Sequence, residues 1–118
     1  MPPYPFPPLP YDEWEETKTR LHLISQMVGK VRLAMAPPLN HWWHAPLYVS
    51  ARGLTTAAIP LGRGPSGRGA FEVELDLIDH VAVARSSSGE SRKIPLVEGT
   101  IADFHASFFG ALRALDID

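Results

Sequence analysis

The feature that most constrains the fold is an apolar stripe that recurs every three or four residues between positions 14 and 35. Its members are Trp14, Thr17, Leu21, Ile24, Val28, Val31 and Met35. This spacing predicts a helix of about six turns with one buried face. Asp12 and Glu15 have the spacing of a capping box at its start. Pro37 disfavours helical geometry at the preceding residue, so we expect the helix to end near Met35.

The middle of the chain alternates between apolar and polar residues, which is typical of strands with one buried face. We expect strands over residues 47–51, 55–61, 71–77, 81–85 and 92–97. The glycine-rich segment 62–69 predicts a hairpin loop. Pro95 in the last run favours an edge strand, because proline cannot donate a hydrogen bond to a neighbouring strand.

A second helical stripe lies near the C-terminus, and it predicts another amphipathic helix. Its apolar members are Ile101, Phe104, Phe108, Leu112 and Leu115. Thr100 and Asp103 have capping-box spacing at its start. The order helix, strands, helix predicts an α+β fold with two layers. In it, the N-terminal and C-terminal helices cover one face of an antiparallel sheet of about five strands.

The length of 118 residues predicts a single domain. We divide the chain into a proline-rich arm over residues 1–10, with six prolines, and one α+β domain over residues 11–118. The net charge of −2 gives no basic surface for nucleic acid, and no apolar run is long enough to span a membrane. With no cysteine in the chain, we expect a soluble cytoplasmic protein without nucleic-acid or membrane partners.

The densest group of hydrogen-bonding rings is segment 40–44, Asn-His-Trp-Trp-His. Such a group next to a strand predicts a small-molecule site. His41 and His44 are the candidate catalytic residues, and hydrolysis is the reaction class that we carry forward as a hypothesis. The candidate substrate-binding residues are Asn40, Trp42, Trp43, Tyr48 and Arg52.

Arg52 gives this hypothesis its charge preference. On a continuous strand, Arg52 would project from the same face as His44 and Tyr48, because residues two apart share a face. A guanidinium there favours an anionic ligand. Arg32 is a weaker candidate for the same role.

Two alternatives to an organic-ligand site stay open for segment 40–44. His41 and His44 have an H-x-x-H spacing, but a metal site needs a further ligand from elsewhere in the chain, so we assign no metal and no cofactor. The histidines and tryptophans could equally be a structural cluster that closes the end of the sheet, with ring nitrogens bonded to the backbone.

Several segments together resemble the bacterial domain of unknown function 5996 family, and the Asn-His-Trp-Trp-His run is the most specific of them. The segments that carry the resemblance are 9–14, 29–34, 37–44, 48–54, 71–73 and 78–80. Members of that family are typically longer, so the chain resembles their N-terminal part. The resemblance implies no activity, cofactor or catalytic residue.

Two classes of function therefore follow from the sequence. One is a small-molecule site, hydrolytic or not, centred on segment 40–44 and favouring an anionic ligand. The other is a non-catalytic interaction or dimerisation module. We expect a homodimer in either case, because a short domain with an edge strand and amphipathic helices leaves surface that proteins usually cover.

Overall fold

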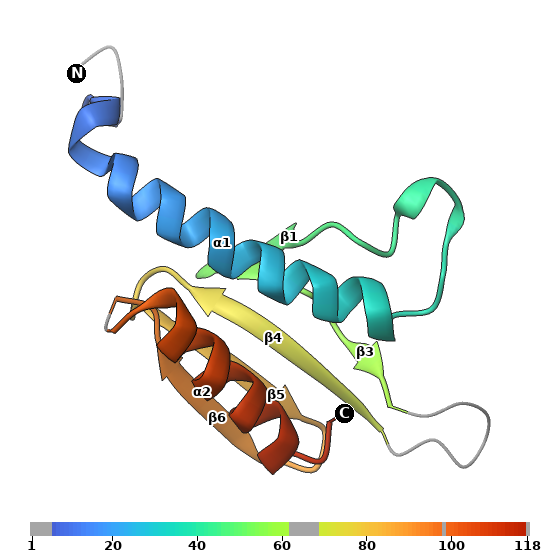
Figure 1. Cartoon of the computed structure of the whole chain (residues 1–118). Helices are drawn as coiled ribbons and strands as arrows, with labels where there is room; N and C mark the ends of the chain where they lie inside the picture. Colours follow the sequence, from blue (N-terminus) through green and yellow to red (C-terminus); the bar gives the residue numbers. More distant parts are fainter. Residues whose placement is uncertain (1–5, 62–68, 98, 118) are drawn as a thin grey trace.

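A computed structural model of the chain describes residues 6–61, 69–97 and 99–117. It contains two helices, α1 (Tyr11–Met35) and α2 (Ile101–Ala114), and a short 3-10 turn, η1 (Asn40–Trp42). Figure 1 shows both helices lying over the same face of one antiparallel sheet. The predicted two-layer α+β fold is confirmed, with six strands in the sheet that the described residues form.

The sheet has the strand order β1-β2-β4-β5-β6, and β3 pairs with the other end of β4. The strands are β1 (Tyr48–Val49), β2 (Gly53–Thr55), β3 (Ile59–Pro60), β4 (Ala70–Asp76), β5 (Val81–Ser86) and β6 (Ser91–Pro95). The predicted edge position of the strand that contains Pro95 is confirmed, because β6 ends the sheet on one side. The short strand β1 ends it on the other.

The core lies between the helices and the inner face of the sheet. Alternate residues of β4 point into it, and Val73 and Leu75 are fully buried there. The helices contribute Val28 from α1 and the stacked rings of Phe104 and Phe108 from α2. Burying a side chain of this size stabilises the fold by about 1.5–3 kcal/mol. This packing fixes where each helix lies and leaves the first turns of α1 exposed.

The two helix starts differ from one another. At α2, Thr100 and Asp103 form the predicted capping box: the Thr100 hydroxyl accepts from the Asp103 amide at 3.1 Å, and the Asp103 carboxylate accepts from the Thr100 amide at 2.9 Å. The capping box predicted at Asp12 and Glu15 is wrong. The helix begins at Tyr11, with Pro10 at the N-cap and no side-chain cap, so Asp12 lies inside the first turn.

The strand predicted over 47–51 is cut short after Val49. The Ser50 hydroxyl accepts from the Gly53 amide at 3.0 Å and closes a turn, so Arg52 lies in this turn and Gly53 begins β2. A side chain at Gly53 would lie 2.0 Å from the Leu75 carbonyl oxygen, and only glycine fits there.

The strand predicted over 55–61 is also divided. Thr56 is fully buried, and its hydroxyl accepts from the Val73 amide at 3.0 Å where a continuous strand would offer a carbonyl. Ala57 follows with a φ of 57°, which turns the chain before β3. Most of the predicted loop over 62–69, and half of the predicted proline arm, fall outside the described residues.

Candidate functional site

Segment 40–44 forms a tight turn that points its tryptophans into solvent. His41 and Trp42 have φ angles of 58° and 60°, in the left-handed region, which costs about 1–2 kcal/mol for each such residue. The Ala45 amide donates to the Trp42 carbonyl at 3.0 Å and holds the turn. Trp42 and Trp43 remain 68% and 62% exposed. The turn therefore presents two large apolar rings on the surface.

The two candidate catalytic histidines have different environments. His44 is buried, and its Nδ1 accepts a hydrogen bond from the Leu39 amide at 3.1 Å. This hydrogen bond fixes the orientation of the imidazole ring of His44. The Trp42 ring stacks on it at 5.7 Å between centroids. His41 is exposed. His44 thus ties the turn to the preceding segment, as the structural alternative requires, while the catalytic role of both residues stays a prediction.

The H-x-x-H spacing gains no further ligand in the described part of the chain. Within those residues, no three histidine, aspartate or glutamate side chains come together in a group that could hold a metal ion.

Arg52 forms ion pairs with two aspartates of the same chain. Its Nε lies 2.6 Å from Asp76 and its second guanidinium nitrogen 3.0 Å from Asp79. This hydrogen bond from Arg52, together with those from the Asp79 and Ile78 amides, lowers the pKa of Asp76 to about 2. Arg52 forms no hydrogen bond or ion pair with segment 40–44 among the described residues. The prediction that Arg52 shares a strand face with His44 and Tyr48 is wrong, because β1 ends at Val49 and Arg52 lies in the turn that follows.

Arg32, and not Arg52, contacts Tyr48. Its guanidinium donates to the Thr56 carbonyl and, at 3.2 Å, to the Tyr48 hydroxyl, and it lies 4.9 Å from the centre of the Tyr48 ring. Arg32 is buried, its Nε has no hydrogen-bond partner, and no described carboxylate pairs with it. The sequence carried a signal for this, since Arg32 follows Val28 by four residues and so shares the buried face of α1.

Several large apolar residues between α1 and β2 are exposed, and we call the segment that carries them the aromatic loop (residues 39–49). Leu39, Trp42, Trp43 and Val49 are between 58% and 87% exposed. The loop runs directly into β1, the edge strand of the sheet (Figure 1). Several large apolar side chains exposed on one short segment are typical of a binding interface.

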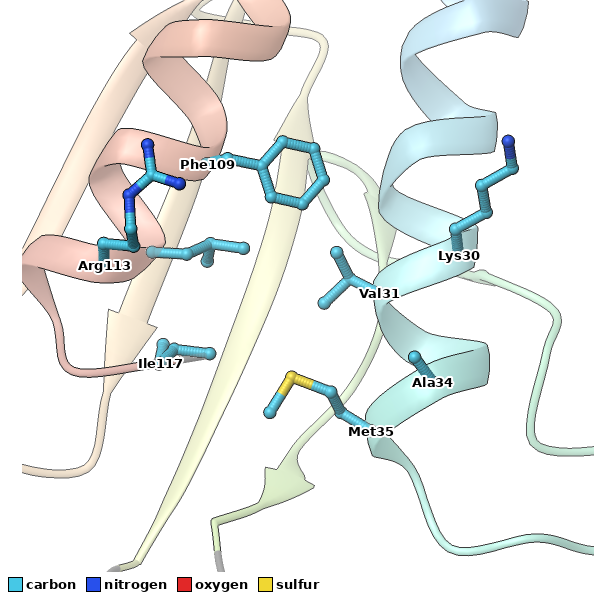
Figure 2. Close-up of a pocket in the computed structure, with 8 residues that line it drawn as sticks. Lys30, Val31, Ala34, Met35, Phe109, Arg113 and Ile117 are labelled. Carbon is cyan, nitrogen blue, oxygen red and sulfur yellow. The ribbon is translucent and has the colours of Figure 1, made fainter.

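A hollow of about 440 Å³ lies apart from this loop, between α1 and α2 (Figure 2). Its lining is Lys30, Val31, Ala34, Met35, Phe109, Leu112, Arg113 and Ile117. Sequence reasoning did not single it out, because its residues come from two helices that meet only in the folded chain.

These features define a small two-layer α+β domain with an exposed aromatic loop at a sheet edge and an apolar hollow between its helices. The chain belongs to DUF5996, a family of unknown function whose model matches residues 6–118, essentially the whole chain. No curated protein and no solved structure matches it. Neither described helix is long and apolar enough to cross a membrane.

Proposed function

We propose that this domain is a non-catalytic dimerisation module in which two copies meet through the aromatic loop and the free edge of β1. The observation that carries the proposal is the exposure of Trp42 and Trp43 in the loop that leads into β1, a strand whose outer edge pairs with no other described strand. Tryptophan is among the residues that contribute most to protein interfaces. Exposed strand edges are a ready template for pairing with another chain.

The backbone of β1 suits a second copy of the same chain. The Ser50 amide donates to the Gly53 carbonyl at 2.8 Å, across the β1–β2 hairpin. Residues that bond to one neighbour alternate along an antiparallel strand, so the amide and carbonyl of Val49 face away from β2. A two-fold axis at Val49 would let the two copies exchange a pair of backbone hydrogen bonds, which is the self-complementary contact of a two-fold dimer.

The two edges of the sheet are not equivalent. Pro95 blocks hydrogen bonding along part of β6, whereas β1 contains no proline. The net charge of −2 gives two copies little reason to repel one another. A stable dimer buries about 1,200–2,000 Å² in total. The tryptophans and Val49 would form its centre.

Sedimentation velocity at micromolar protein concentration tests the proposal. The parent chain should sediment as a dimer, and Trp42→Ser with Trp43→Ser should sediment as a monomer with an unchanged circular dichroism spectrum. Val97→Ser is the matched control, because Val97 is 68% exposed after β6, at the opposite edge of the sheet. It should leave the dimer intact. The proposal would be refuted by a monomeric parent, or by a dimer that the double tryptophan variant and Val97→Ser weaken equally.

The buried charge of Arg32 supports a second candidate, a small-molecule site for an anion. A buried guanidinium without a carboxylate is costly unless another anion compensates it. A small carboxylate or phosphate near Tyr48 would provide the missing negative charge. If the site is hydrolytic, His41 and His44 would be its catalytic residues and Asn40 would bind the substrate. Thermal unfolding with acetate and with phosphate should show stabilisation of the parent and none of Arg32→Met. Equal shifts in both proteins would argue against this site.

We also propose a cytoplasmic location, which the absence of cysteine supports. Oxidising compartments favour chains that use disulfides, and this chain has none to form.

A further inference from the structure

The hollow between α1 and α2 combines an apolar floor with two cations. Figure 2 shows Val31 and Met35 of α1 facing Ile117 and α2 across the gap, with the ring of Phe109 above them. The volume of about 440 Å³ falls within the range of about 300–1,000 Å³ that is usual for small-molecule sites. A ligand that removes the apolar residues of this floor from water would be stabilised by the burial of apolar surface.

The charged side chains that line the hollow are both cationic. Lys30 lines it from α1 and Arg113 from α2, while none of its lining residues is acidic. Neither cation forms an ion pair with any residue that the structure describes. Both therefore remain able to bind an anionic group, whereas Arg52 and Arg85 are already paired with carboxylates.

Ala34 offers a position at which the hollow can be filled by substitution. It is the smallest side chain in the lining and lies on α1 between Lys30 and Met35. Because Ala34 lines the hollow, we expect a larger residue there to occupy part of it. The position is exposed, so the gap opens to solvent and a ligand can enter without unfolding the core.

We propose that this hollow binds an amphipathic anion, a medium-chain carboxylate whose alkyl chain lies on the apolar floor between the helices and whose carboxylate meets Lys30 or Arg113. Opposite charge at the rim and apolar residues beneath it match the two ends of such a molecule. This site is separate from the aromatic loop, so it can be correct whether or not the chain dimerises.

Isothermal titration of the full chain with sodium decanoate, below its micelle concentration, tests the proposal. Decanol and decyltrimethylammonium have the same chain length without the negative charge. Decanoate should bind saturably, about fivefold or more tightly than decanol, since an exposed ion pair contributes modestly to affinity. The cationic ligand should bind more weakly than either.

Variants separate the hollow from unspecific adsorption. Ala34→Phe should abolish decanoate binding by filling the hollow, whereas Ala106→Phe, at an exposed position of α2 outside the lining, should leave it unchanged. Lys30→Gln with Arg113→Gln should reduce the preference for decanoate over decanol to about one while decanol still binds.

Three outcomes would overturn the inference: no saturable binding of decanoate, equal affinity for all three amphiphiles, or equal loss in the two phenylalanine variants. Decanoate binding that weakens as protein concentration rises would mean that a second copy occupies the hollow, which also overturns it. Circular dichroism of each variant excludes unfolding as the cause of a lost signal.

Discussion

Replacing Thr56 by valine should destabilise the domain more than its small chemical change suggests. Valine keeps the shape of the side chain but removes the hydroxyl, which accepts from the Val73 amide at 3.0 Å and donates to the Ala57 carbonyl at 2.7 Å. Thr56 and Val73 are both fully buried, so no water can replace the lost acceptor of the Val73 amide.

The expected loss follows from these two bonds. An unsatisfied buried amide costs about 1–3 kcal/mol, and the half-buried Ala57 carbonyl costs less because water can reach it. We therefore expect Thr56→Val to lower the free energy of unfolding by about 2–3 kcal/mol. Thr55→Val is the matched control. Among the described residues, the one hydrogen bond of the Thr55 hydroxyl is from the half-buried Ala57 amide. Valine is favoured in strands, so the loss for Thr55→Val should stay below about 1 kcal/mol.

Urea denaturation followed by circular dichroism measures the free energy of unfolding of both variants and the parent. The dependence of this free energy on urea concentration should be the same in all three proteins if their folded and unfolded states stay comparable. A loss for Thr56→Val below about 0.5 kcal/mol, or no larger than that of Thr55→Val, would refute the hydroxyl's role in dividing the strand at this point.

Two further predictions concern charge and capping. The pKa of Asp76 is lowered to about 2 by Arg52 and two backbone amides, so its stabilising effect should be complete above the ordinary aspartate pKa near 4 and should be lost as pH falls through 2. The urea midpoint of the parent should fall as pH is lowered across this window. Asp76→Asn should have a lower midpoint above about pH 4 and a smaller fall across the window. An equal fall of the midpoint in the two proteins would contradict this prediction. Thr100→Ala should cost about 0.5–2 kcal/mol by removing the α2 cap, whereas Asp12→Ala should change stability little, because α1 has no side-chain cap. Equal losses in thermal unfolding would contradict this difference.

Local patterns in the sequence predicted much of the fold. The stripe from Ile24 to Met35, the alternation around Val73 and the Thr100 cap each depend on residues close in sequence, and a helix or strand needs little else to be recognised. Pro95 likewise marked the edge of the sheet, because the missing amide hydrogen acts wherever the strand lies.

The candidate site was less predictable, because it depends on where the strands break. Arg52 was expected beside Tyr48 on a continuous strand, but the Ser50 hydroxyl closes a turn and directs Arg52 to Asp76. Arg32, distant in sequence, lies against Tyr48 instead. Left-handed backbone at two consecutive residues without glycine, as at His41 and Trp42, is uncommon, so no local pattern indicated that the tryptophans would be exposed.

Disulfide trapping of the two copies is the most direct test of the proposed dimer, because the chain has no cysteine of its own. With a two-fold axis at Val49, the two Val49 Cα atoms would lie about 5.5 Å apart, within the range of about 4.4–6.8 Å that a disulfide spans. Val49→Cys should form a covalent dimer under mild oxidation at micromolar concentration, and Val97→Cys, at the other edge of the sheet, should stay largely monomeric. Equal cross-linking of the two variants, or none in Val49→Cys, would contradict an interface built on the β1 edge.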